Sequence, residues 1–145
     1  MKARVTSYLT NALSHEMSIV QQYLAQSRLC ALLGLPEEAY FRREAGEELG
    51  HAAQIIEVLL KLGVSPNATR LDPARPGRDL FEMLSIDRQL ELEAVHLYGE
   101  AAEYCRRFGE LPLAGFFLDL MKDEEAHLGE LDKMLASLQR QGAMT

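Results

Sequence analysis

The stretch GVSPNATRLDPARPG, residues 63–77, decides the fold of this chain because it interrupts an otherwise helical sequence. It contains three prolines and two glycines, which are typical of loops. On both sides of it, apolar residues recur every three or four positions, which is the spacing of amphipathic helices. A fully extended segment of fifteen residues reaches about 50 Å, whereas a helix of roughly 27 residues is about 40 Å long. The segment is therefore long enough to cross a helical bundle from end to end.

Four helices are expected around this segment, and no stretch shows the alternation typical of strands. Their expected ranges are residues 3–32, 36–62, 78–108 and 112–141. Short links join the first helix to the second and the third to the fourth, so each pair should form an antiparallel hairpin. We expect an all-α, ferritin-like four-helix bundle, in which two antiparallel hairpins are joined by a long crossover loop. Residues 1–145 would form one domain, since a two-helix half has too little core of its own to be an independent one.

Composition excludes several classes of function. The net charge is −7 and the basic residues do not cluster, which argues against nucleic acid as a partner. The N-terminus lacks the apolar core of a signal peptide, and no apolar run is long enough to cross a membrane. The two cysteines, Cys30 and Cys105, are isolated in helical patterns and predict buried apolar positions without a disulfide. We expect a cytoplasmic protein with no membrane partner.

Each expected helix carries a glutamate on its apolar face, about halfway along its length. These residues are Glu16, Glu48, Glu91 and Glu124. Two of them are followed at the third position by a histidine on the same helix face, namely His51 and His127. Unpaired buried charges cost several kcal/mol each, and two divalent cations would neutralise all four carboxylates. One glutamate from each of two helices and Glu-x-x-His from each of the other two is a known pattern of dimetal bundles.

The ligand types indicate which metal is expected. Carboxylate and imidazole ligands suit iron or manganese, and no thiolate lies in the pattern to favour a structural zinc. The sequence does not distinguish iron from manganese or from a mixed pair. Glu93 and His96 have the same spacing, but they begin two residues after Glu91, about 200° round the helix. We expect them to face solvent, and His15 to point away from the metal site.

Three further residues have two interpretations each. Asp87 and Asp123 could accept the second N–H of a metal-bound imidazole, or they could be surface or capping residues. Tyr23 lies on the same face as Glu16 and could donate a hydrogen bond to a ligand carboxylate, or it could be an ordinary core residue.

The sequence resembles the bacterioferritins, of the ferritin-like superfamily, over nearly its whole length. The resemblance is carried by four motifs: HEMSIVQQY at 15–23, EELGHA at 47–52, SIDRQLELE at 85–93 and MKDEEAHL at 121–128. It implies a ferroxidase centre in which two Fe(II) ions are oxidised by O₂ or peroxide. The resemblance implies that Glu16 and Glu91 are terminal or bridging carboxylates and that Glu48 and Glu124 bind or bridge the metals. It implies that His51 and His127 bind one ion each. Tyr23 matches a family tyrosine beside this centre.

Two departures from the family pattern matter. Bacterioferritins bind haem through a methionine directly after the glutamate of the second helix, and here that position is Leu49, so no haem is expected. The family also has a short fifth helix that helps to close a 24-subunit shell. Here eighteen residues follow His127, and we expect that helix to be missing or vestigial. The sequence leaves open whether the protein assembles as a homodimer or as a larger cage.

The leading hypothesis is therefore a ferroxidase that binds and oxidises Fe(II) with O₂ or peroxide, for iron storage or detoxification. A second hypothesis is a dimeric di-iron oxidase or peroxidase that retains its metals, acts on peroxide or an organic substrate and needs an electron donor. A third is a bundle without enzymatic activity that acts as an assembly partner.

Overall fold

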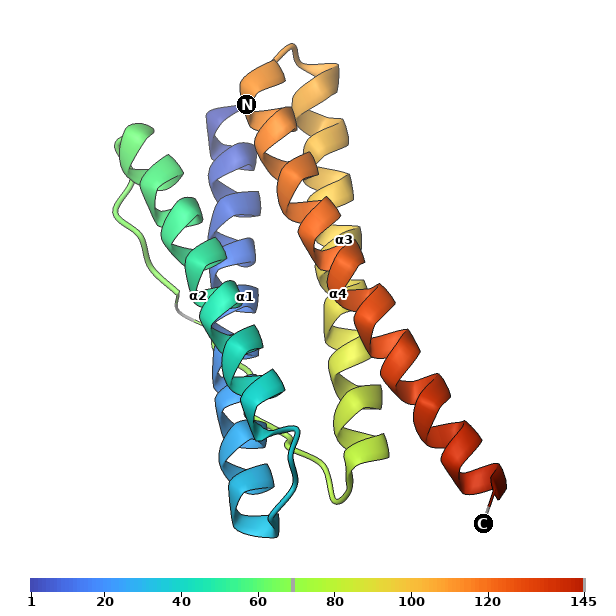
Figure 1. The fold of residues 1–145 in the computed structure, drawn as a ribbon. Coiled ribbons are helices and arrows are strands. Elements are labelled where there is room, and N and C mark those ends of the chain that lie inside the picture. Colours follow the sequence, from blue (N-terminus) through green and yellow to red (C-terminus); the bar gives the residue numbers. More distant parts are fainter. Residues whose placement is uncertain (69, 145) are drawn as a thin grey trace. The chain divides into compact units, whose positions relative to one another are not determined.

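The computed structural model describes residues 1–68 and 70–144 (Figure 1). It has four α-helices, α1 (Lys2–Leu33), α2 (Glu38–Lys61), α3 (Leu80–Arg107) and α4 (Leu111–Met144). These described ranges contain no strand, and none of their helices is long and apolar enough to span a membrane. Residues 128–144 prolong α4 and do not form a separate helix. The chain divides into two compact units, Met1–Pro76 and Gly77–Thr145, each containing one hairpin.

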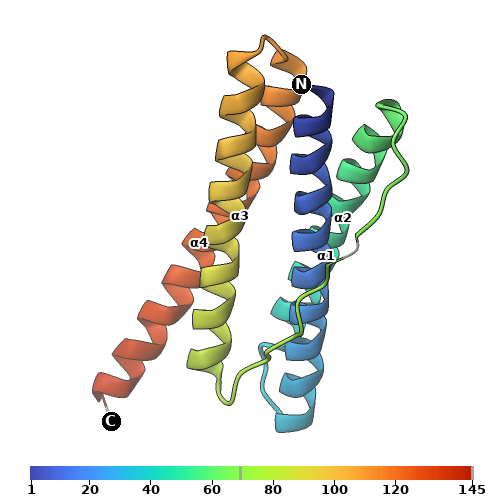
Figure 2. The same cartoon turned by 180° about the vertical axis from the view of Figure 1, so that it is seen from behind.

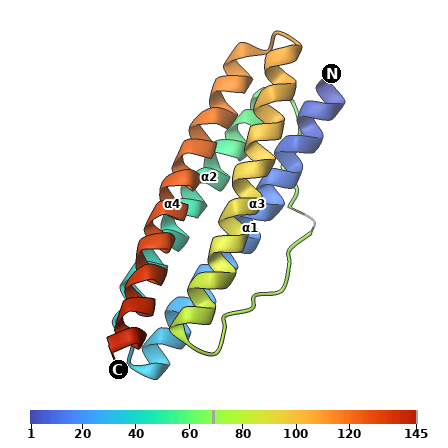
Figure 3. The ribbon, with the colours of Figure 1, turned by 90° about the vertical axis from the view of Figure 1, so that its right-hand side faces the viewer.

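The first unit is the hairpin of α1 and α2, which lie side by side (Figure 3). Gly34 ends α1 in the left-handed conformation, with a φ of 71° that favours glycine. The N–H of Leu35 donates to the Cys30 carbonyl at 2.8 Å, so the chain turns sharply into α2. The apolar faces of the two helices pack together, and their buried residues include Leu9, Leu13, Ile19, Phe41, Ile55 and Leu59.

The crossover loop that follows α2 lies along α1 (Figure 2). The Asp72 N–H donates to Ser18 Oγ at 2.9 Å. Gln22 then holds Arg75 by two hydrogen bonds, one from the Arg75 N–H and one to its carbonyl, at 2.8 and 2.7 Å. Because the hairpin is antiparallel, α2 ends near the start of α1, and the loop runs from there in the direction of α1. The predicted lengthwise crossover is thus confirmed.

The second unit is the hairpin of α3 and α4. Asp79 caps α3 by accepting a 2.8 Å hydrogen bond from the Glu82 N–H, which satisfies one of the free donors at the helix start. Gly109, with a φ of 75°, provides the turn into α4. The interior of this hairpin contains Met83, Leu84, Tyr98, Phe117, Leu120 and Leu131.

The two hairpins repeat one arrangement of aromatic rings. Tyr23 of α1 stacks on Phe41 of α2, with ring centroids 6.2 Å apart and an interplanar angle of 29°. Tyr98 of α3 stacks on Phe117 of α4 at 6.3 Å and 28°. In each hairpin the tyrosine follows the core glutamate of its helix by two turns. The two halves of the chain therefore share the same aromatic pair in their interiors.

A substitution at Gly77 tests the turn that starts the second unit. Gly77 has a φ of 98°, and a Cβ built there would lie 2.9 Å from the Met83 backbone nitrogen. Gly77→Ala combines a strained backbone with a clash against backbone, so we expect a loss of about 1–3 kcal/mol in the free energy of unfolding. Gly109→Ala is the matched control, because its φ is also positive but a Cβ there meets nothing within 4 Å. Equal effects of the two substitutions on thermal unfolding would contradict the steric argument.

Candidate metal centre

The first hairpin gathers three of the six predicted ligands in its interior. Glu16 comes from α1, and Glu48 and His51 come from α2. Both carboxylates are 0% exposed and the imidazole is 6% exposed. His51 Nδ1 lies 3.7 Å from a Glu16 oxygen and 3.5 Å from a Glu48 oxygen. The three residues thus present their ligand atoms to one small volume.

The second hairpin gathers the other three in the same way. Glu91 comes from α3, and Glu124 and His127 come from α4. The carboxylates are again 0% exposed and the imidazole is 5% exposed. His127 Nδ1 lies 3.6 Å from a Glu91 oxygen and 3.8 Å from a Glu124 oxygen. Each hairpin therefore contains a buried triplet of two carboxylates and one imidazole.

Helix geometry explains why each triplet forms. Glu48 and His51 are three residues apart, as are Glu124 and His127, so each pair lies on one face of its helix. The antiparallel turn then sets the middle of one helix against the middle of the other, which brings the single glutamate opposite the pair.

The triplets fit a divalent cation. Ligand atoms that bind one ion at about 2.0–2.2 Å lie roughly 3–4 Å from one another, and the observed nitrogen–oxygen distances fall in this range. Within the part of the chain that the structure describes, the ligand atoms of each triplet all lie within 4.8 Å of one another. A mixed oxygen and nitrogen donor set suits iron or manganese.

The cysteines do not alter this assignment. Cys30 and Cys105 are both buried and unpaired by disulfides. Burial raises the pKa of the Cys105 thiol, and the Glu110 carboxylate adds to the shift. The thiol is therefore protonated near neutral pH, which makes it a poor metal ligand.

The other predicted residues occupy different environments. Asp87 is buried on α3, whereas Asp123 is exposed on α4, as the surface interpretation of that residue requires. Tyr23 is 1% exposed and packs on Phe41. Glu93 and His96 are both exposed, as expected from their position round the helix.

Tyr98 and Glu44 are buried side chains with polar groups that the sequence did not single out as site residues. Tyr98 is 0% exposed and occupies the position in the second hairpin that Tyr23 occupies in the first. Its spacing from Glu91 matches that of Tyr23 from Glu16, and this repeat could have revealed it. Glu44 is 1% exposed one turn before Glu48, and its carboxylate lies 3.9 Å from Arg43 Nε. Only its placement on the Glu48 face could have indicated that it is buried.

Comparison with known proteins decides the family. Residues 6–141 match the Ferritin-like domain. The chain is 37% identical to a bacterioferritin of Rhodobacter capsulatus over 141 residues, which cover 97% of this chain and 88% of that protein. It is 30% identical to a bacterioferritin of Streptomyces coelicolor over 139 residues, 95% of this chain and 83% of that one. The chain belongs to the bacterioferritin family.

A solved bacterioferritin structure extends the comparison to the fold. The structure of the Rhodobacter capsulatus bacterioferritin, described with a metal-free dinuclear site and a haem iron, matches with a TM-score of 0.93 at 35% identity. The match covers 98% of this chain and 89% of that chain. The predicted bacterioferritin resemblance and the predicted four-helix-bundle fold are both confirmed. Membership places the chain among iron-binding proteins of the ferroxidase and iron-storage family.

Proposed function

We propose that this bacterioferritin-family protein is a ferroxidase that binds Fe(II) and oxidises it with O₂ or peroxide, for iron storage or detoxification. The observation that supports the proposal is the buried Glu–Glu–His triplet in each of the two hairpins. We further propose that the two triplets together form one dinuclear centre, whose ligands are Glu16, Glu48, His51, Glu91, Glu124 and His127. Fe(II) is the substrate, and two Fe(II) ions supply one electron each, so that together they reduce O₂ to hydrogen peroxide or hydrogen peroxide to water, with two protons taken from solvent.

The protein residues have three tasks in this reaction. The four carboxylates compensate the charge of two cations, and they stabilise the more highly charged Fe(III) product better than Fe(II). His51 and His127 supply neutral ligands that keep the site from becoming too anionic. Burial of all six side chains excludes bulk water, which strengthens each electrostatic interaction. Tyr23, buried on the Glu16 face, would help to orient a ligand carboxylate.

Assembly of several copies is part of the proposal, as a homodimer or a larger cage. Five leucines on α1 and α2 are about half or more exposed: Leu24, Leu32, Leu33, Leu49 and Leu60. Such residues are suited to contacts between copies. These contacts would also serve the alternative function, a dimeric di-iron oxidase or peroxidase that retains its metals.

One experiment tests the function and separates these two candidates. The protein is loaded with Fe(II) with and without oxygen, native mass is measured, and metal is counted per subunit. We expect two metal ions per subunit without oxygen and a rise in Fe(III) absorbance when oxygen is admitted. A cage that accumulates further iron supports storage, whereas a dimer holding two non-exchanging ions supports the alternative. Absence of bound iron in both conditions would refute both.

We also propose that the protein binds no haem, because Leu49 cannot supply a lone pair to an iron. Leu49 is 52% exposed on α2, so its side chain is accessible on the helix surface. A methionine thioether can be an axial haem ligand. We therefore expect Leu49→Met to gain a haem Soret band that the unmodified protein lacks.

Leu60→Met is the control for the haem experiment. Leu60 is also on α2 and is 59% exposed, so this variant adds a similarly accessible methionine elsewhere on the same helix. Haem binding by the unmodified protein, or equal binding by the two variants, would show that Leu49 does not determine the absence of haem.

A further inference from the structure

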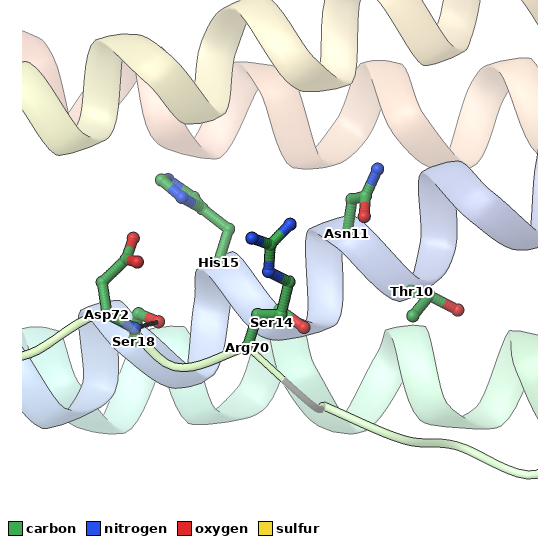
Figure 4. Close-up of a pocket in the computed structure, with 7 residues that line it drawn as sticks. All are labelled: Thr10, Asn11, Ser14, His15, Ser18, Arg70 and Asp72. Carbon is green, nitrogen blue, oxygen red and sulfur yellow. Dashed lines mark hydrogen bonds between the residues drawn. The ribbon is translucent and has the colours of Figure 1, made fainter.

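A polar pocket lies between α1 and the crossover loop (Figure 4). Its volume is about 240 Å³. The side chains that matter below are Thr10, Asn11, Ser14 and His15 from α1, with Arg70 and Asp72 from the loop. None of the six proposed metal ligands lines the pocket, so it is a different site.

The loop is held against α1 beside this pocket. Ser18, which also lines the pocket, accepts the hydrogen bond of the Asp72 N–H. One turn further along α1, Gln22 holds Arg75 through both of its backbone groups. These attachments fix the path of the loop and so place the Arg70 side chain over α1.

Arg70 carries a positive charge that no described residue pairs with. Within residues 1–68 and 70–144, its guanidinium forms no ion pair or hydrogen bond, although it lines a pocket of polar side chains. The side chains of Thr10, Asn11 and Ser14 likewise form no hydrogen bond with any described residue. The pocket therefore offers a guanidinium, an amide and two hydroxyl groups whose donors are available to a ligand.

The charges are separated along the pocket. Figure 4 shows the Arg70 guanidinium between the side chains of His15 and Asn11, whereas the Asp72 carboxylate lies on the far side of His15. The Arg70 guanidinium and the Asn11 amide thus lie next to each other on the side of His15 away from the carboxylate, and this part of the pocket is called the Arg70 end. In a chain of net charge −7, such an isolated basic end is a preferred place for an anion.

We propose that the Arg70 end of this pocket binds a small tetrahedral oxyanion of the phosphate class. A phosphate has oxygens in four directions, which suits a guanidinium fork together with amide and hydroxyl donors from a second element. The volume leaves room for the anion with several waters, since one water occupies about 30 Å³. The polar lining disfavours an apolar ligand of similar size.

The test is titration of metal-free protein with inorganic phosphate at low ionic strength, measured by calorimetry. We expect saturable binding of one phosphate per chain, weakened about tenfold or more by Arg70→Gln, because a charge-assisted hydrogen-bond donor is lost. Arg75→Gln is the matched control, since Arg75 is exposed on the same loop and does not line the pocket. It should change the affinity by less than about twofold.

Three further measurements make the proposal specific. Asp72→Asn should bind phosphate at least as tightly as the unmodified protein, because a like charge is removed from the pocket. Sulfate should compete with phosphate, whereas tighter binding of acetate than of phosphate would overturn the assignment. Absence of saturable binding, or equal losses in Arg70→Gln and Arg75→Gln, would also overturn it. Glu48→Gln should leave phosphate binding unchanged, so this test and the metal tests can fail independently.

Discussion

The double substitution Glu48→Gln, His51→Ala should reduce Fe(II) oxidation by about a hundredfold or more. Loss of groups that merely orient metal ligands already costs 10–100-fold in affinity or activity, and here two proposed ligands are removed directly. Stopped-flow absorbance of Fe(III) measures the rate, and metal analysis measures the bound iron. Circular dichroism should show unchanged helix content, because both side chains are replaced without altering the apolar packing around them.

The chain provides its own control for this substitution. Glu93 and His96 have the same spacing as Glu48 and His51, but they are exposed. Glu93→Gln, His96→Ala should therefore leave the oxidation rate within about twofold of the unmodified protein. A comparable loss in this control would mean that the measured effect is not specific to the buried residues.

A third double variant tests whether the two triplets act as one centre. Glu124→Gln, His127→Ala alters only the second hairpin. If both hairpins contribute to one dinuclear site, this variant should be as inactive as the variant of the first hairpin. If each hairpin binds and oxidises iron independently, each double variant should retain about half of the activity, which would contradict the proposed dinuclear centre.

The second large effect is expected in the stability of the protein. Mn(II), which avoids the oxidation of Fe(II), should raise the melting temperature of metal-free protein by roughly 5–10 °C. Metal at a hundred times its dissociation constant adds about 2.7 kcal/mol to the free energy of unfolding, and each kcal/mol raises the melting temperature of a chain of this size by about 2–4 °C. Thermal unfolding with and without Mn(II) measures the shift.

Replacing two of the proposed ligand carboxylates should change how the melting temperature depends on Mn(II). Glu48→Gln, Glu124→Gln removes two charges that are 0% exposed and that no bound cation compensates in metal-free protein. We expect the metal-free variant to melt at a higher temperature than the metal-free parent and to gain little from Mn(II). A variant that melts lower and is still stabilised by Mn(II) would show that these carboxylates stabilise the fold without binding metal.

The fold was predictable because it depends on patterns that are local in sequence. Helical spacing, the glycines at helix ends and the composition of residues 63–77 together specify two hairpins and a crossover. The triplets were predictable for a similar reason. A glutamate and a histidine three residues apart must share a helix face, and a short hairpin turn brings the opposing glutamate level with them.

Other features depend on contacts that helical spacing does not encode. Tyr98 follows the core pattern of α3, so an ordinary aromatic core residue was the simpler interpretation until its stacking on Phe117 showed the repeat. The pocket at Arg70 depends on the path of the loop, which is fixed by hydrogen bonds that Ser18 and Gln22 accept from the loop backbone. His15 was expected only to avoid the metal site, and its place in that pocket could not be inferred from α1 alone.

The attachment of the crossover loop to α1 has a consequence for how the chain can vary in length. The hydrogen bonds that hold the loop begin at Asp72 and continue through Arg75 to Pro76, whose carbonyl accepts from Gln26. Residues inserted near Asn67 would lengthen the segment before this anchor, at a small entropic cost of closing a longer loop. The attachments of Asp72, Arg75 and Pro76 to α1 would be kept. Natural or engineered extensions, such as an epitope tag, are best accommodated there, whereas an insertion after Asp72 would displace every attachment that follows.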